Sequence, residues 1–183
     1  MKRKKNSKVW DALTQKQSDY LIQAGWFDTA KYDNDVPVGG IAAVQNYGAL
    51  INVTEKMRAF FRYEFGVNLR KDTKQIVIPA THFWENCKKE NKEKWKKLCK
   101  YHWQKVFLGE ITADTVAEEL GSQVENDIRK QMSNGDYPPV TRLTLTNKLK
   151  QYKDQSTVGQ LGQRFQTKEH KMLDDISHKV EKI

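Results

Sequence analysis

The sequence is poor in cysteine and has no long apolar segment. Only two of its 183 residues are cysteines, which excludes a disulfide-rich scaffold. No apolar run approaches the roughly 18 residues that a membrane-spanning helix needs. The opening residues, MKRKKNSKVW, are basic but lead into no apolar stretch, so we expect no secretory signal peptide. These absences predict a soluble protein that is made and kept in a reducing cytoplasm.

The sequence also has no recognisable catalytic or phosphate-binding motif. Gly39-Gly40 and the pair Gly159 and Gly162 match neither the P-loop nor the dinucleotide-binding fingerprint. His170, Asp174 and His178 recur every four residues, but no nucleophile or orienting group accompanies them. We therefore predict no catalytic residue, no cofactor and no enzymatic activity.

Basic residues outnumber acidic ones. The chain has 32 Lys and Arg against 23 Asp and Glu, a formal net charge of +9. This excess favours an acidic partner such as nucleic acid, although it says nothing about fold. Five Trp, seven Tyr and seven Phe are enough to build one core. The length fits one domain with extensions.

The spacing of apolar residues and the positions of glycine and proline predict the elements of the first half of the chain. Val36–Val53, VPVGGIAAVQNYGALINV, carries β-branched residues and glycines that are typical of one or two strands. Thr54 and Gly66 are expected to begin and end the following helix. The predicted elements are a helix over Asp11–Ala24, strands within Val36–Val53, a helix over Thr54–Gly66 and a strand over Thr73–Ala80 that ends near Pro79.

The segment from Thr81 to Trp103, THFWENCKKENKEKWKKLCKYHW, raises the question of a zinc site. It contains His82, Cys87, Cys99 and His102, yet no Gly or Pro interrupts a helix over Ala80–Leu108. At 1.5 Å per residue, Cys87 and Cys99 would be about 18 Å apart on that helix. Ligands of one zinc ion lie only about 2.0–2.3 Å from the metal. We therefore predict packed thiols and imidazoles, and no metal site.

The polar face of this helix is rich in lysine. It carries Lys88, Lys89, Lys92, Lys96 and Lys100, with Glu85, Glu90 and Glu93 among them. Such a face is usually just solvated, but lysines also attract nucleic-acid phosphates without sequence preference. No aromatic platform is interleaved with these lysines, and Trp84 and Trp95 lie on the apolar stripe. Both interpretations stay open.

A second helix follows after Gly109. Thr112 or Thr115 is a candidate N-cap, and Val116, Leu120, Val124, Ile128 and Met132 recur every four residues. The two helices predict a hairpin over Trp84–Met132 that packs on a sheet drawn from Val38–Ile78. The fold class is therefore α+β, with a small, mostly antiparallel β-sheet packed against a long helical hairpin and flexible N- and C-terminal extensions.

This organisation predicts three consecutive parts. Residues 1–35 form a basic arm and helix, 36–155 an α+β core domain, and 156–183 a flexible segment and a C-terminal amphipathic helix. The apolar stripe of that last helix comprises Met172, Leu173, Ile176, Val180 and Ile183. A helix this short is not stable alone, so we expect it to dock on its own domain or on a partner.

Five short motifs follow one another between Val38 and Phe165. They are Tyr47-Gly48, Ile78-Pro79 with Phe83, Leu120-Gly121, Pro138-Pro139-Val140-Thr141 and Thr157-Val158-Gly159-Gln160-Leu161. This succession resembles the tail-completion or neck proteins of tailed bacteriophages, also called phage virion morphogenesis proteins. The resemblance lies in order and spacing rather than in any one motif. Ala80-Thr81-His82 departs from the Arg-Pro that usually follows Ile-Pro-x in that family.

The resemblance implies a structural virion protein between the DNA-filled head and the tail. It implies an α+β domain assembled with itself into a ring around the DNA channel, a hexamer or alternatively a dodecamer. The implied partners are a head-completion or connector protein, a tail terminator or tail tube, and packaged phage DNA bound without sequence preference. No membrane and no metal is implied. The basic excess agrees with a ring through which DNA passes.

Two sets of residues are candidates for these roles. The DNA-channel-facing candidates are Lys88, Lys89, Lys92, Lys96 and Lys100. The candidate assembly contacts are Pro138, Pro139, Leu161, Phe165, Ile176 and Val180. Two alternatives remain, a basic nucleic-acid-binding domain with a regulatory or packaging role and a zinc-stabilised domain. The first predicts salt-sensitive DNA binding without protein partners, and the second a stoichiometric metal.

Overall fold

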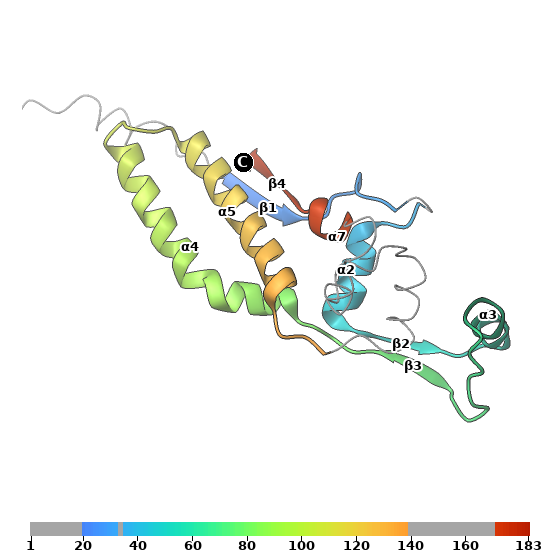
Figure 1. Ribbon diagram of the computed structural model, residues 1–183. Helices are drawn as coiled ribbons and strands as arrows, with labels where there is room; N and C mark the ends of the chain where they lie inside the picture. Colours follow the sequence, from blue (N-terminus) through green and yellow to red (C-terminus); the bar gives the residue numbers. More distant parts are fainter. Residues whose placement is uncertain (1–19, 33–34, 139–170) are drawn as a thin grey trace, which may run out of the picture. The chain divides into compact units, whose positions relative to one another are not determined.

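The computed structural model describes residues 20–32, 35–138 and 171–183, and it has an α+β fold (Figure 1). The chain divides into two compact units. Among the described residues, unit 1 contains 20–26, 85–131 and 176–183, and unit 2 contains 27–32, 35–84, 132–138 and 171–175. Both units are therefore built from segments that are far apart in the sequence.

Unit 1 contains most of two long helices, α4 (Phe83–Phe107) and α5 (Ala113–Asn134). Lys94 of α4 pairs with Asp127 of α5, and further along α4 His102 pairs with Glu119, so the two helices run antiparallel. The unbroken first helix and the second helix through Met132 are both confirmed. Thr112 accepts a hydrogen bond from the backbone N–H of Thr115 at 3.2 Å, and it is therefore the N-cap.

The two ends of the described chain form an antiparallel ribbon in unit 1. Strand β1 (Tyr20–Gly25) pairs with β4 (Ser177–Lys182), with Tyr20 opposite Lys182 and Ala24 opposite His178. The predicted helix over Asp11–Ala24 is wrong for its described part, and the predicted C-terminal helix is wrong beyond Asp174. In these two segments, strand pairing outweighs the local helical periodicity, because each strand supplies the hydrogen-bond partners for the other strand's backbone N–H and C=O groups.

Unit 2 begins with α2 (Val38–Tyr47), which replaces the first of the predicted strands. That prediction is wrong because Val38, Ala42 and Asn46, four residues apart, form the buried face of a helix. Pro37 precedes the first helical residue with extended backbone angles, as proline at a helix start often does. A one-turn helix, α7 (Lys171–Asp174), packs beside α2.

A second ribbon extends from α2 and carries one more helix. Strands β2 (Ala49–Asn52) and β3 (Gln75–Ile78) are antiparallel, and α3 (Glu55–Phe65) lies between them in sequence. The strand ending before Pro79 and the helix between Thr54 and Gly66 are confirmed. The predicted sheet is antiparallel, as expected, but it consists of two separate two-stranded sheets, β1–β4 and β2–β3. The ribbon beside α5 in unit 1 is therefore β1–β4 rather than a sheet drawn from Val38–Ile78.

The corner between β3 and α4 explains two of the sequence motifs. Asn46 is buried, and its side-chain oxygen accepts a hydrogen bond from the backbone N–H of Trp84 at 3.0 Å. A Cβ atom on Gly48 would lie 2.7 Å from the Ile78 carbonyl oxygen, so only glycine fits between these backbone segments. Tyr47-Gly48 and Ile78-Pro79 thus meet in space. Their spacing in the sequence reflects one tightly packed corner.

The buried apolar residues are divided between the units. Val116 and Ile128 are buried as the four-residue periodicity predicts, whereas Leu120 and Val124 are half-buried. In unit 1 the buried apolar residues are Cys87, Val116, Ala117, Ile128 and Ile176, and in unit 2 they are Val38, Ala42, Phe83, Met132 and Met172. Among the described helices, none is both long and apolar enough to cross a membrane.

Candidate nucleic-acid interface

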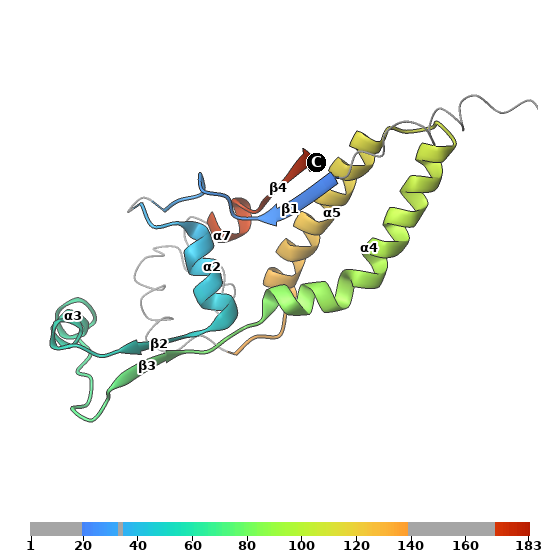
Figure 2. The ribbon, with the colours of Figure 1, turned by 180° about the vertical axis from the view of Figure 1, so that it is seen from behind.

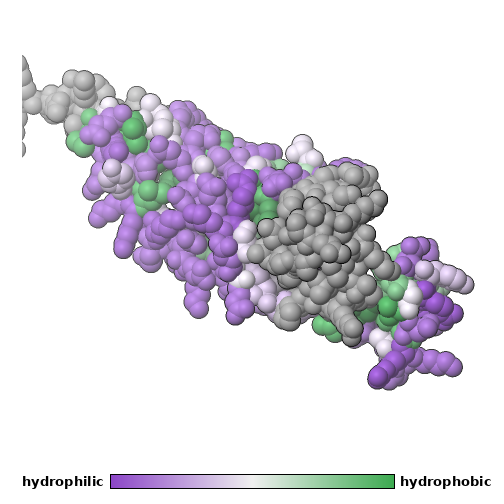
Figure 3. All heavy atoms as spheres, in the orientation of Figure 1, coloured by the Kyte–Doolittle hydropathy of each residue, from purple (hydrophilic) through white to green (hydrophobic). Residues whose placement is uncertain are grey.

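The outward face of α4 carries the predicted lysine row. We define this row as Lys88, Lys89, Lys92, Lys96 and Lys100, all of which are exposed. At 100° per residue the last four lie within about 80° of one another, and they extend over about 17 Å of helix. Figure 3 shows mainly hydrophilic side chains over this part of the molecule.

Most of the lysine row has no acidic partner. Lys96 forms an ion pair with Glu93 at 2.8 Å, but both side chains are exposed, so the pair is weak. Within the described parts of the chain, the other four lysines of the row form no ion pair. Their charges are thus available to a polyanion.

The rotation of α4 is set by a buried carboxylate on α5. Asp127 is only 4% exposed. It accepts hydrogen bonds from Lys94 Nζ at 2.6 and 2.7 Å, from Trp95 Nε1 at 2.8 Å and from Gln123 Nε2 at 3.0 Å. Burial by itself would raise the pKa of Asp127, but these donors outweigh it and the pKa lies below its ordinary value. The charged carboxylate therefore holds one face of α4 towards α5, and the lysine row points away.

His102 gives a second contact between these helices. Its Nδ1 atom lies 2.8 Å from Glu119 Oε2, a close polar contact without hydrogen-bond geometry. The imidazole is half-buried on the α5 side of α4, where the apolar stripe was predicted. His102 and Asp127 together orient α4 over two of its turns.

The two thiols lie apart from this polar contact. Cys87 is buried and Cys99 half-buried, and both are free. Burial, with the nearby Asp127 carboxylate, raises the pKa of Cys87 to about 11, so this thiol stays protonated. Across the described ranges, no three His, Cys, Asp or Glu side chains lie together as metal ligands would.

Aromatic side chains continue the lysine row towards the C-terminal end of α4. Trp103 and Phe107 fall in the same sector of the helix as Lys96 and Lys100, and their ring centroids are 6.5 Å apart. These rings follow Lys100 and are not interleaved with the lysines, so they extend the surface without contradicting the expectation made for the row itself. The spacing of three and seven residues from Lys100 is the signal that could have identified them.

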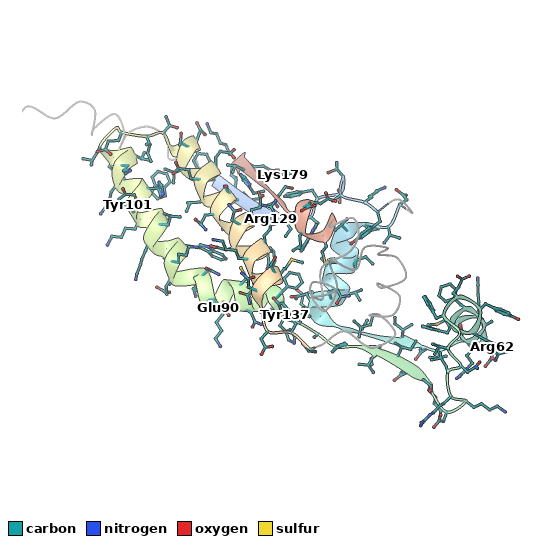
Figure 4. The ribbon with its side chains drawn as sticks, in the orientation of Figure 1. Arg62, Glu90, Tyr101, Arg129, Tyr137 and Lys179 are labelled. Carbon is teal, nitrogen blue, oxygen red and sulfur yellow. The ribbon has the colours of Figure 1, made fainter. Side chains whose placement is uncertain are left out.

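Tyr101 lies on another side of α4. Its ring is about half exposed and Lys105 Nζ lies 4.7 Å from the ring centroid, a cation–π distance. Figure 4 labels Glu90 and Tyr101 along the helix. This contact occupies Lys105, which therefore does not add to the lysine row.

The candidate assembly contacts are not gathered in one place. Pro138 is exposed at the end of a described segment, whereas Pro139, Leu161 and Phe165 lie outside the described residues. Ile176 is 1% exposed and belongs to the core of unit 1, so its expected role as a contact with another chain is corrected. Val180 is half-buried on the β1–β4 ribbon. The apolar periodicity of this segment serves the chain's own packing.

A cluster of charges joins β4 to α5. His178 Nδ1 lies 2.6 Å from Glu125 Oε2, and His178 Nε2 lies 3.2 Å from Glu118 Oε2. Arg129 pairs with Glu125 at 2.6 Å and donates to the Ile176 carbonyl at the same distance (Figure 4). His178 is thus on a strand whereas Asp174 ends α7, and His170 lies outside the described residues. The cluster is structural, since it ties the chain's last strand to α5.

The motif Leu120-Gly121 has its explanation in this cluster. A Cβ atom at Gly121 would come within 2.4 Å of the His178 ring. Glycine therefore lets the imidazole lie against α5 between Glu118 and Glu125.

A scan against protein-family models and searches of curated proteins and of solved structures found no match to this chain. Function is therefore inferred from the chain's own side chains and their geometry.

Proposed function

We propose that this chain is a structural protein of a tailed-phage virion. In this proposal it belongs to the neck, where it completes the tail and joins it to the head as part of a ring around the DNA channel. The observation that carries the proposal is the lysine row on α4, exposed and largely without acidic partners. A structural, non-enzymatic role requires such a charged surface and no catalytic residues.

The geometry of the row suits a duplex that must be held weakly and allowed to move. Lys92, Lys96 and Lys100 rise by about 6 Å per step. That spacing corresponds to about one lysine for every two phosphates of a strand lying along the helix, because successive phosphates of a strand rise by about 3.4 Å. Lysine contacts with phosphates carry no sequence information, so they do not stop DNA at any particular site.

Exposed apolar side chains in unit 2 support an assembled state. Tyr47, Leu50 and Val77 are each more than half exposed, and Leu50 and Val77 are cross-strand neighbours on one face of the β2–β3 ribbon. Apolar groups that cluster on a surface commonly mark contacts with other proteins. A ring neighbour, a connector protein or a tail terminator or tail-tube protein would cover them.

The proposal is tested by recovering the tagged protein, after nuclease treatment, from bacterial cells that produce it. We expect a closed homo-oligomer with the mass of a hexamer, bound to head-connector or tail proteins that mass spectrometry identifies. Recovery of a monomer without such partners would contradict the neck proposal.

The same experiment separates the second candidate function. Trp103 and Phe107 at the end of the lysine row favour a basic nucleic-acid-binding domain with a regulatory or packaging role, since aromatic and basic groups together are typical of such surfaces. For that function the chain would be retained by nucleic acid before nuclease treatment and released by it, with no protein partner.

A further inference from the structure

The end of the β2–β3 ribbon carries a second surface, distinct from the lysine row. We call it the arm tip and define it as Thr54–Lys74, which comprises α3 and the loop that follows. Figures 1 and 2 show α3 beyond the end of the ribbon in both views. No residue of α3 is buried, so this helix contributes almost nothing to a core. An element that the fold does not need for its packing is a candidate for binding.

The arm tip is nevertheless a well-defined structure. The Thr54 side chain caps α3 by accepting from the Met57 N–H at 3.2 Å. One guanidinium, that of Arg58, donates to several carbonyls of the loop and so fixes it against the helix. The accepting oxygens are those of Leu69 at 3.5 Å, Arg70 at 2.8 Å, Lys71 at 3.4 Å and Thr73 at 2.7 Å. A surface held in this way loses little conformational entropy on binding.

Aromatic rings are presented on this fixed surface. Phe60 is 52% and Tyr63 82% exposed. Phe60 makes edge contacts with Phe61 and Phe65, at centroid distances of 6.0 and 5.5 Å, which hold its ring in place. Lys56, Phe60 and Tyr63 fall within about 60° on the helix, so a cation and two aromatic rings share one face.

The charge of the arm tip is positive. Its sequence contains six basic and three acidic residues, a net charge of +3. The basic residues are Lys56, Arg58, Arg62, Arg70, Lys71 and Lys74, and the acidic ones are Glu55, Glu64 and Asp72. Arg58 pairs with Glu55 at 3.4 Å and Arg62 donates to Asn68 at 3.0 Å. The other four basic side chains have no ion pair in the described ranges. Lys56 shares the face of the two exposed rings, and Arg70, Lys71 and Lys74 belong to the loop that Arg58 holds against the helix.

We propose that the arm tip binds single-stranded nucleic acid, with bases stacked on Tyr63 and Phe60 and phosphates held by Lys56, Lys71 and Lys74. Stacking needs bases with free faces, which a single strand offers and an intact duplex does not. The charge argues for a polyanion rather than a second copy of this surface, because two copies would bring +3 against +3. This site is independent of the lysine row and of assembly into a ring.

Fluorescence anisotropy of the full chain tests the site, using a fluorescein-labelled 20-nucleotide oligo(dT) and a labelled 20-base-pair duplex. Tyr63→Ala should weaken oligo(dT) binding about tenfold, the expected loss of one stacked base, and leave duplex binding unchanged. Tyr63→Trp should retain binding. Tyr101→Ala is the matched control, because Tyr101 is also an exposed tyrosine, 52% accessible, but lies on α4 outside the arm tip and the lysine row. Circular dichroism should show all three variants folded.

The phosphate contacts are tested separately, by the salt dependence of oligo(dT) binding. Lys71→Gln with Lys74→Gln should reduce the slope of log affinity against log salt for oligo(dT) by about 1.4, since each single-strand contact contributes about 0.7. Photocrosslinking of an oligonucleotide containing 5-iodouridine should label Tyr63 or Phe60, identified by mass spectrometry.

Three results would overturn the proposal. One is oligo(dT) binding by Tyr63→Ala equal to that of the unchanged chain. Another is oligo(dT) binding that is lost in Lys92→Gln/Lys96→Gln on α4 but kept in Tyr63→Ala. The third is a Tyr63→Ala variant that changes only the oligomeric state, which would make the arm tip a protein contact.

Discussion

Asp127 illustrates how one residue decides which way the lysine row faces. Its carboxylate is nearly inaccessible and receives hydrogen bonds from both Lys94 and Trp95, neighbours on α4. Trp95 was expected to be apolar packing, but its indole N–H needs a partner when the ring is half-buried, and Asp127 supplies it. The sequence offers only an indirect signal, an acidic residue beside the apolar stripe of α5.

Asp127→Ala should lower the free energy of unfolding by about 2–3 kcal/mol, because it leaves the Trp95 N–H and the Gln123 amide without this acceptor. The loss is at the lower end for a broken buried pair, since Lys94 is nearly half exposed and can turn to water. Urea unfolding measures it. Glu93→Ala removes an exposed partner of Lys96 and should leave the midpoint unchanged. Equal effects of the two substitutions would contradict the anchoring role of Asp127.

At the scale of elements, α4 combines two functions on one helix. One side is tied to α5 by Asp127 and Glu119, and the other side presents the lysine row and the Trp103–Phe107 pair. Helix formation over Phe83–Phe107 needs no tertiary explanation, because no Gly or Pro interrupts it and lysine and glutamate are good helix formers. The partition of its faces, however, depends on α5.

Lys92→Gln with Lys96→Gln should reduce the slope of log affinity against log salt for duplex DNA by about 1.8, which is about 0.9 for each lost phosphate contact. Anisotropy with a labelled duplex from low to moderate salt gives this slope. Lys130→Gln with Lys179→Gln removes the same charge from exposed positions on α5 and β4 and serves as the control. A slope that falls equally in both variants would show a general charge effect and no contact by the lysine row.

At the scale of the whole molecule, segments from the two ends of the chain complete unit 1. Strands β1 and β4 pair with each other, and polar contacts attach the ribbon to α5 along its length. Lys182 pairs with Asp114 at 2.7 Å at one end, and His178 lies between Glu118 and Glu125 further along. Arg129 binds the Ile176 carbonyl at the other end. Unit 1 is therefore complete only after the last strand is in place.

The attachment should depend on pH through His178. The hydrogen bond that His178 donates to the Glu125 carboxylate raises the pKa of His178 above its ordinary value of 6.5, with a smaller contribution from Glu118, although partial burial opposes the shift. A raised histidine pKa stabilises the folded state fully below about pH 6.5, and this stabilisation is lost as the pH rises through the raised value. Urea unfolding at a series of pH values should show the free energy of unfolding falling from about pH 6.5 upwards. His178→Gln should show a smaller fall, and an identical fall in both proteins would contradict the role of His178.

The amino-acid sequence by itself determined the elements whose signals are local. The long helix of α4, the second helix of α5, the capped helix α3 and the short strand before Pro79 all follow from periodicity and from residues at their ends, although the choice between Thr112 and Thr115 as the N-cap of α5 needed the structure. The exposed lysines follow in the same way, because charged groups on the polar side of an amphipathic helix stay in water.

Only the tertiary structure decided the rest. Tyr20–Gly25 and Ser177–Lys182 become strands because each supplies the other's backbone hydrogen bonds, although local spacing favoured helices. Val38–Tyr47 becomes a helix because Val38, Ala42 and Asn46 are buried together. The burial of Asp127, the position of His178 beside Gly121 and the exposure of Tyr63 on α3 all depend on which segments meet in space. Contacts between distant residues are a property of the folded chain, and no local pattern encodes them.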